Sequence, residues 1–85
     1  MTAEALEAEL LAFLEGRTKA SLTVDRDLFA SGLVSSLFAM ELVVHLESSY
    51  GISIVGTDLQ LDNFRTVQKM AELVLRLRAT AASGA

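Results

Sequence analysis

The stretch Gly32–Leu42, "GLVSSLFAMEL", decides the fold of this 85-residue chain. It ends a loop and opens an apolar segment with strong helical character, and two adjacent serines, Ser35 and Ser36, stand at the point of change. One serine at a helix start is ordinary, because its hydroxyl can accept a hydrogen bond from a backbone N–H in the first turn. The second serine needs a separate explanation.

The helix that starts here is predicted over residues 36–50, ended by Gly51, and it is apolar on two sides. The core side holds Phe38, Ala39, Leu42, Val43, Leu46 and Tyr50. The other side carries a second apolar stripe of Leu37, Met40 and Val44. Glu41 and Glu47 edge this stripe, and His45 lies at its border. Such a helix is either central in the fold or presents a patch to a partner. Both interpretations stay open: more core under the preceding loop, or a docking surface with an acidic rim.

Helical spacing also predicts a helix over residues 3–15, capped by Thr2 and stopped by Gly16, and a last helix from 66 or 67 to about 79. Residues 57–62 allow a short third helix, for which Asp58 is the expected cap.

The apolar residues of 17–34 do not recur with the period of a helix or a strand, so we expect a long loop. Its spaced apolar side chains should pin it to the bundle, and residues 25–30 should form a short helical turn. Residues 50–56 are an extended connection. The prediction is an all-α four-helix bundle with three longer helices, a short third helix and a long first loop. It forms a single domain over residues 1–79, followed by a flexible tail over 80–85.

Composition excludes several classes of protein. With 52% hydrophobic and 21% charged residues, the chain is globular. It has no cysteine and one histidine, so it builds neither a disulfide framework nor a thiolate or His-based metal site. Its apolar runs are too short to span a membrane, and its acidic start lacks the basic region of a signal peptide. We therefore expect a cytoplasmic setting.

The net charge of −4 is unevenly distributed. No lysine or arginine lies between Arg26 and Arg65. That interval contains the acidic residues Asp27, Glu41, Glu47, Asp58 and Asp62. A negative surface over the middle of the protein disfavours nucleic acid and favours basic partners.

The serines do not form a hydrolase site by themselves. A serine nucleophile needs a base within reach, and the only histidine, His45, lies nine residues beyond Ser36 on the same predicted helix, about two and a half turns away. A serine that another enzyme modifies needs only exposure and a recognisable surface beside it. A phosphate ester at this position would also lie near helix N-terminal amides.

At this point the residues resemble a known family. The stretch "DLFASGLVSSLFAMELVVHLESSYGISI" (27–54), followed by "DNFRTV" (62–67), is similar to acyl carrier proteins and peptidyl carrier domains. The order and spacing agree over about residues 4–78. The family pattern has Asp-Ser-Leu at the start of the second helix, and its serine receives a 4′-phosphopantetheine arm from coenzyme A through a phosphopantetheinyl transferase. The resemblance implies a carrier and not an enzyme.

The resemblance assigns roles to residues. Ser36, which directly precedes Leu37, matches the attachment site, and Ser35 replaces the usual Asp as the helix cap. The alternative frame takes Ser35 as the attachment site, with Ser36 in the position of the family's leucine. The positions of the core-side residues along the helix argue against this alternative. The resemblance gives the role of partner docking to Leu37, Met40, Glu41, Val44 and Glu47, and Asp62 adds to the acidic rim. The space that shelters the cargo would be lined by Val43, Leu46, Leu59, Leu61 and Phe64.

The predicted function is a free-standing, monomeric carrier that holds an acyl or aminoacyl group as a thioester. The chain looks most like discrete carriers of secondary-metabolite pathways for polyketides and antibiotics, including carriers of modified malonyl extender units. Its partners would be the transferase and the enzymes that load, modify and accept the cargo, all with basic docking surfaces. The alternative is a small helical interaction module that is never modified.

Overall fold

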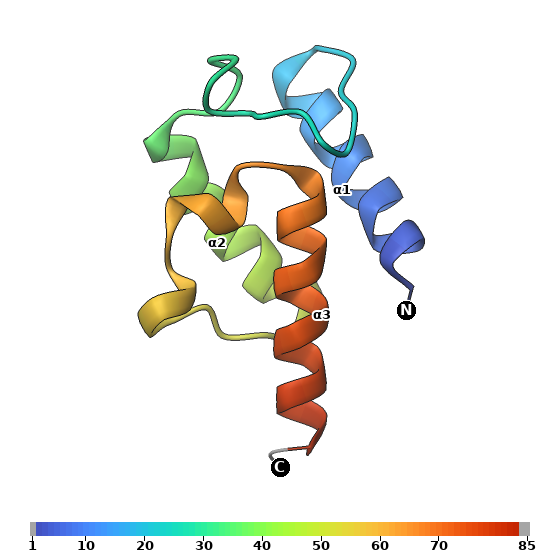
Figure 1. Ribbon diagram of the computed structural model, residues 1–85, viewed down its shortest axis with the longest axis vertical. Coiled ribbons are helices and arrows are strands. Elements are labelled where there is room, and N and C mark those ends of the chain that lie inside the picture. Colours follow the sequence, from blue (N-terminus) through green and yellow to red (C-terminus); the bar gives the residue numbers. More distant parts are fainter. Residues whose placement is uncertain (1, 84–85) are drawn as a thin grey trace.

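The computed structural model describes residues 2–83, with side chains as far as residue 80. Its elements are α1 (Ala3–Thr18), α2 (Ser36–Tyr50), two 3-10 turns η1 (Gly56–Asp58) and η2 (Leu61–Phe64), and α3 (Val67–Ser83). A long loop connects the upper ends of α1 and α2, and α3 crosses in front of α2 (Figure 1). The described residues contain no strand, which confirms the all-α fold of acyl-carrier type.

The first helix is longer than predicted. Thr2 caps it as expected, accepting a hydrogen bond from the Ala5 N–H at 3.1 Å. The predicted stop at Gly16 is wrong, because α1 continues through this glycine to Thr18. A glycine inside a helix costs only about 1 kcal/mol. The helix ends where Lys19 adopts the left-handed conformation (φ 58°) and its N–H donates to the Glu15 carbonyl at 2.9 Å.

The second helix has the predicted bounds. Ser35 is its N-cap and accepts a hydrogen bond from the Phe38 N–H at 3.1 Å. Gly51 closes the other end in the left-handed conformation (φ 65°), which glycine adopts without steric cost, and its N–H donates to the Glu47 carbonyl at 3.0 Å. Both ends of α2 therefore follow from local chemistry that the sequence displays.

The third helix and the tail differ from their predictions. The region of 57–62 forms η1 and η2 instead of one short helix. Asp58 caps neither turn, because its carboxylate pairs with Arg76 of α3 at 2.9 Å. The last helix reaches Ser83, so the first part of the tail predicted over 80–85 is helical, while residues 84–85 lie outside the described residues.

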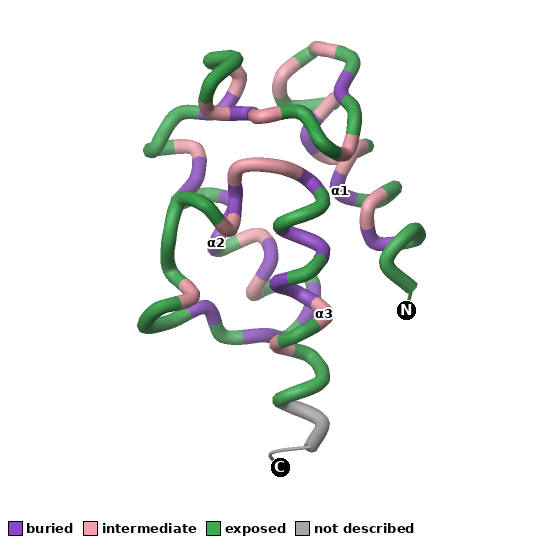
Figure 2. The backbone as a smooth tube through the Cα atoms, in the orientation of Figure 1, coloured by how far each residue is buried: buried purple, intermediate pink, exposed green. Residues whose placement is uncertain are grey.

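The core is built by all three helices and by the long loop (Figure 2). The helices and η2 contribute Leu6, Leu10, Leu14, Leu42, Leu46, Phe64, Met70 and Val74, all at most 2% exposed. Leu22, Leu28 and Val34 of the loop are buried with them. The prediction that apolar side chains pin the loop is confirmed.

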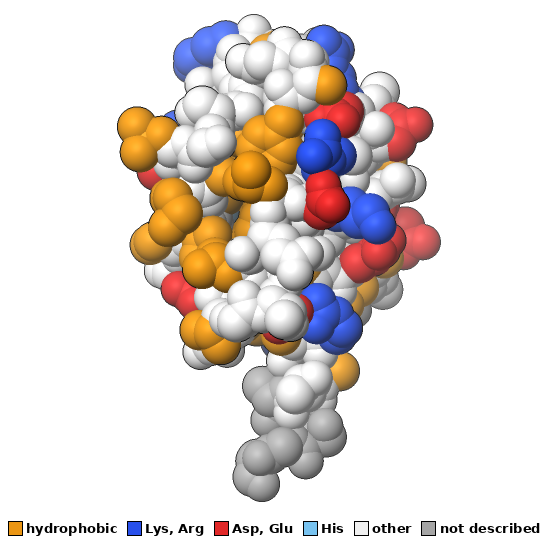
Figure 3. All heavy atoms as spheres, turned by 60° about the vertical axis from the view of Figure 1, so that its left-hand side comes forward, with side chains coloured by type: hydrophobic (Ala, Val, Ile, Leu, Met, Phe, Trp, Pro, Cys, Tyr) orange, Lys and Arg blue, Asp and Glu red, His pale blue; other side chains and the backbone are white. Residues whose placement is uncertain are grey.

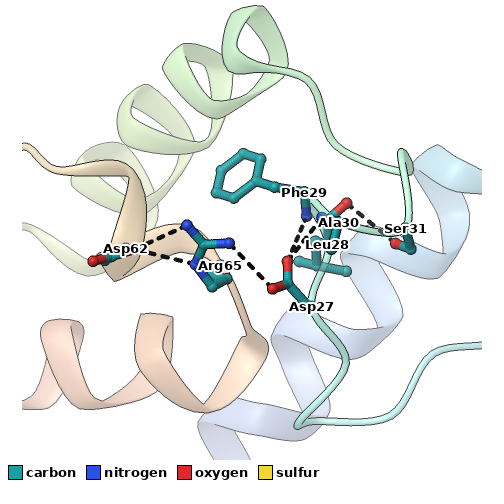
Figure 4. Close-up of polar contacts among 7 residues, drawn as sticks. All are labelled: Asp27, Leu28, Phe29, Ala30, Ser31, Asp62 and Arg65. Atoms are coloured by element: carbon teal, nitrogen blue, oxygen red, sulfur yellow. Dashed lines mark hydrogen bonds and ion pairs between the residues drawn. The ribbon is translucent and has the colours of Figure 1, made fainter.

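Polar contacts hold the loop against the start of α3 (Figure 4). Asp27 accepts hydrogen bonds from the N–H groups of Phe29 and Ala30 at 3.1 and 2.9 Å, and its other oxygen pairs with Arg65 at 3.1 Å. The Ala30 N–H and the Arg65 guanidinium hold the pKa of Asp27 below its usual value, against a smaller opposing effect of burial. The predicted helical turn over 25–30 is a capped turn, in which the Ser31 N–H donates to the Asp27 carbonyl at 3.2 Å.

Candidate functional site

The two serines at the start of α2 have different surroundings. Ser35 is bound into the helix end by its hydrogen bond from the Phe38 N–H. Ser36 is the first residue of α2 and is exposed, and its hydroxyl makes no hydrogen bond to any described residue. The first N–H groups of a helix have no intrahelical acceptor, so Ser36 lies beside donors that suit an anionic group.

A small apolar cleft of about 90 Å³ lies one turn further along α2. It is lined by Ala39, Met40, Val43, Leu59, Gln60, Leu61 and Phe64. Met40 lies four residues after Ser36, so both share one side of the helix. Val43, Leu59, Leu61 and Phe64 line this cleft as predicted. Leu46 does not line this cleft, and its side chain is wholly buried in the core.

The second apolar stripe of α2 is exposed. Leu37, Met40 and Val44 are 79%, 55% and 64% exposed, so the interpretation of this stripe as further core is wrong. Leu59 and Leu61, across the small cleft from α2, are 47% and 49% exposed. Side chains this large and this exposed on neighbouring elements are typical of an interaction surface.

The acidic residues expected around this stripe are engaged within the protein. Glu41 pairs with Arg17 at 2.6 Å, and Asp62 pairs with Arg65 at 3.0 Å. The Glu47 carboxylate accepts a hydrogen bond from the Ile54 N–H at 2.8 Å and so braces the connection after α2. The docking roles of Glu41, Glu47 and Asp62 thus stay predictions, for side chains that already have a partner.

A wider cleft of about 280 Å³ lies on the other side of Leu37. It is lined by Arg17, Thr18, Leu33, Ser35, Leu37, Phe38 and Glu41. The Arg17 guanidinium lies 4.9 Å from the centre of the Phe38 ring, a cation–π distance. Sequence reasoning missed Arg17, because nothing in the local pattern links it to Glu41, twenty-four residues away.

His45, at the border of the second apolar stripe, packs against α1, although its border position favours a solvated side chain with no role. Its ring stacks on Phe13 of α1, with 3.8 Å between ring centres and an angle of 8° between the planes. It is half-buried there and far along α2 from the serines.

The residues that the structure describes include no cluster of three His, Cys, Asp or Glu side chains able to hold a metal ion.

The arrangement at Ser36 fits a phosphate ester of a long flexible group. The hydroxyl is accessible to a modifying enzyme, the helix start offers N–H donors, and an apolar cleft lies one turn away.

Within residues 2–83 the structure has no helix long and apolar enough to cross a membrane.

Comparison with known proteins identifies the family. A family described as "Phosphopantetheine attachment site" matches residues 8–74. The D-alanyl carrier protein of Streptococcus thermophilus (strain ATCC BAA-491 / LMD-9) is 36% identical over 55 residues, which are 65% of this chain and 70% of the relative. The D-alanyl carrier protein of Streptococcus pyogenes serotype M1 matches with the same identity and coverage. The chain therefore belongs to the phosphopantetheine-attachment family, whose members are non-catalytic carriers with a covalently attached 4′-phosphopantetheine group.

Proposed function

We propose that Ser36 is the residue to which a phosphopantetheinyl transferase attaches the 4′-phosphopantetheine group. The observation that carries this proposal is the different hydrogen bonding of the two serine hydroxyls. The Ser35 hydroxyl is held in the helix cap, whereas the Ser36 hydroxyl is exposed and without a hydrogen bond to any described residue. Ser35 caps as well as Asp but adds no negative charge, so a transferase meets a less acidic helix start than the family pattern provides.

When attached, the arm supplies a thiol that carries an acyl or aminoacyl group as a thioester. The residues of this chain bind and shelter that cargo. The cleft beside Met40 and Val43 is apolar except for Gln60 and holds about 90 Å³, so it suits a short cargo. The names of the D-alanyl carrier relatives support an aminoacyl cargo, and the resemblance of α2 to secondary-metabolite carriers supports a modified malonyl group.

We propose a monomeric carrier that works as a separate unit in the cytoplasm. Its partners are the transferase and the enzymes that load, modify and accept the cargo. Support for a monomer comes from the core, which the three helices and the loop close without a second copy. Loading assays with an amino-acid-activating enzyme and with a malonyl-type acyl donor would distinguish the two classes of cargo.

The decisive experiment is intact mass after incubation with coenzyme A and a broad-specificity transferase. The wild type and Ser35→Ala should each gain one phosphopantetheinyl group, and Ser36→Ala should gain none. Modification lost only with Ser35→Ala would establish the alternative frame. No gain in the wild type, under conditions that modify a control carrier, would favour an interaction module that works unmodified.

A further inference from the structure

The wide cleft of about 280 Å³ has no part in the proposed modification of Ser36, although it begins beside that residue. It lies where the end of α1, the end of the long loop and the start of α2 meet. Ser35 and Leu37 both line it, whereas Ser36 between them lines neither this cleft nor the small one. Glu41 of its lining is five residues after Ser36, about 7.5 Å along the helix axis. A flexible group attached to Ser36 therefore starts beside both clefts.

The two clefts differ in size and in the side chains that line them. The small cleft holds about 90 Å³, and Gln60 is the polar residue of its lining. Met40, Leu59 and Leu61 of that lining are exposed, and Figure 3 shows hydrophobic side chains gathered over one part of the surface. The wide cleft is about three times larger, and charged or hydroxyl side chains line it at Arg17, Thr18, Ser35 and Glu41. Polar atoms that enter the wide cleft thus find both donors and acceptors.

Two aromatic rings position Arg17 at the wall of the wide cleft. Its guanidinium carbon lies 4.9 Å from the centre of the Phe38 ring and 5.7 Å from the centre of the Phe13 ring. Stacking uses the face of the guanidinium and leaves the N–H donors, which lie in its plane, available to acceptors. One nitrogen donates to Glu41 at 2.6 Å, and the other two make no hydrogen bond to any described residue. Arg17 is therefore a positioned cation with unused donors.

The other polar groups of the wide cleft are also available to a ligand. The side chains of the Arg17–Glu41 pair are 49% and 57% exposed, and such exposed pairs contribute little to stability, so a ligand can share or separate this one. Ser35 accepts a backbone N–H and keeps its own O–H as a donor. Thr18 donates to the Leu14 carbonyl at 2.8 Å and keeps a lone pair as an acceptor.

We propose that the unloaded 4′-phosphopantetheine arm rests in the wide cleft, where Arg17 donates to an amide carbonyl of the arm and Glu41 accepts an amide N–H. The inference rests on the proposed attachment at Ser36. The arm contains amide groups, a hydroxyl and a dimethyl-substituted carbon. An amide that is buried without a hydrogen bond costs free energy, which disfavours the apolar small cleft for the arm itself. In the wide cleft, Leu33 and Leu37 offer apolar contact to the dimethyl group.

Loading changes which cleft is favoured. A short acyl group on the thiol adds apolar surface, which suits the small cleft. The wide cleft thus serves the unloaded arm and the small cleft serves the cargo. Attachment at Ser36 gives the arm an effective concentration of about 1 mM or more at a neighbouring site. A cleft with a dissociation constant of about 1 mM is then occupied about half of the time and still releases the arm to an enzyme.

The first test locates the unloaded arm by NMR. Proton–nitrogen correlation spectra are compared between the unmodified protein and the modified, unloaded protein. Beyond Ser36 and its two neighbours, the largest shifts should fall on the Arg17 side-chain Nε–H and on the backbone N–H groups of Thr18 and Leu33. Shifts confined to residues 59–64, which would place the arm in the small cleft, would overturn the proposal. Shifts confined to Ser36 and its neighbours would overturn it equally, because the arm would then lie in solvent.

The second test removes the cation from the wide cleft. Loss of a hydrogen bond from a charged donor should weaken the site by about tenfold or more, so in Arg17→Gln the occupancy falls from about half to about a tenth. The shifts at Thr18 and Leu33 should shrink in proportion. Arg26→Gln is the matched control, because Arg26 is an exposed arginine that lines neither cleft, and its shifts should equal those of the wild type. Equal shifts in Arg17→Gln and Arg26→Gln would contradict the assignment. Circular dichroism and thermal unfolding of the unmodified variants confirm that each is folded.

A titration with free pantetheine separates this inference from the modification itself. In the unmodified wild type, about 10 mM pantetheine should shift the same N–H groups of Thr18 and Leu33, and Arg17→Gln should need about tenfold more. If coenzyme A and the transferase add no mass to the wild type, the proposed role of Ser36 fails, and the titration still decides whether the cleft binds pantetheine. If the mass is gained but neither the modified protein nor the titration shifts these groups, only the present inference fails.

Discussion

Replacement of leucine by alanine should lower the free energy of unfolding strongly at Leu28 and hardly at all at Leu37, although the two residues are only nine positions apart. Leu28 of the long loop is 0% exposed, and Leu37 of α2 is 79% exposed. Leu28→Ala leaves a cavity in the core, at a cost of about 3 kcal/mol of unfolding free energy. Leu37→Ala removes no core contact and should change the unfolding free energy by less than about 0.5 kcal/mol.

The cost at Leu28 is large for a chain of this size. A domain of 85 residues has a stability of about 4–13 kcal/mol, so the substitution removes a quarter or more of it. The midpoint of thermal unfolding should fall by about 12–24 °C. The backbone hydrogen bonds of this residue stay available in the variant, since alanine keeps the N–H that donates to the Arg65 carbonyl at 2.8 Å and the carbonyl that accepts from the Leu33 and Val34 N–H groups at 3.1 Å. The loss therefore measures the buried side chain alone.

Urea and thermal unfolding followed by circular dichroism measure both variants, and transferase kinetics give the second readout. Leu37→Ala should keep the wild-type midpoint but raise KM for the transferase. A Leu28→Ala variant that loses less than about 1 kcal/mol would refute the reasoning, because the loop would then not be held by its buried side chains. A loss of stability at Leu37 as large as at Leu28 would refute it equally.

Three further predictions concern single residues. Burial and the hydrogen bond to Glu9 raise the pKa of Tyr50 to about 12, so ultraviolet absorbance of this only tyrosine should show ionisation near that pH in the folded protein. The stability that this shift contributes is complete below the unfolded pKa of about 10 and is lost as the pH rises through 12; Tyr50→Phe should abolish that loss. Ser35→Ala should cost about 1 kcal/mol in urea unfolding and leave the gain in mass at Ser36 intact, and loss of that gain would contradict the assignment. Lys19→Gly should raise the free energy of unfolding by about 1 kcal/mol because it relieves a left-handed non-glycine residue, and an unchanged or lower value would contradict this geometry.

The sequence was most informative where structure depends on neighbouring residues. The bounds of α2, the Ser35 cap and the Gly51 end follow from local capping, and the structure agrees with all of them. Local spacing also gives the stripe of Leu37, Met40 and Val44, but its exposure depends on how the long loop packs and was decided only by the fold. The family followed from the same stretch, because its pattern is local too.

The errors concern competition between local signals and distant partners. Gly16 is a good helix stop, but Lys19 ends α1 instead, a position that residue preferences do not favour. Asp58 is of a residue type that commonly caps helices, but its carboxylate pairs with Arg76, eighteen residues away. The interval without basic residues predicts an open acidic surface, whereas Arg17 and Arg65, which lie outside that interval, pair with Glu41 and Asp62. Such pairings depend on the fold and leave no periodic trace in the sequence.

The anchoring of the long loop has a consequence for the order of events during synthesis. The Gln68 N–H donates to the Val24 carbonyl at 3.0 Å, and the Arg65 carbonyl accepts from the Leu28 N–H. Both bonds hold the loop that leads into Ser36, yet Arg65 and Gln68 follow Ser36 by about thirty residues in the chain. A nascent chain that stops before them contains both serines but lacks the anchor that fixes their approach. The surface around Ser36 is therefore complete only once α3 has begun to form, so we expect the modification proposed for Ser36 to follow folding and not to occur during translation of α2.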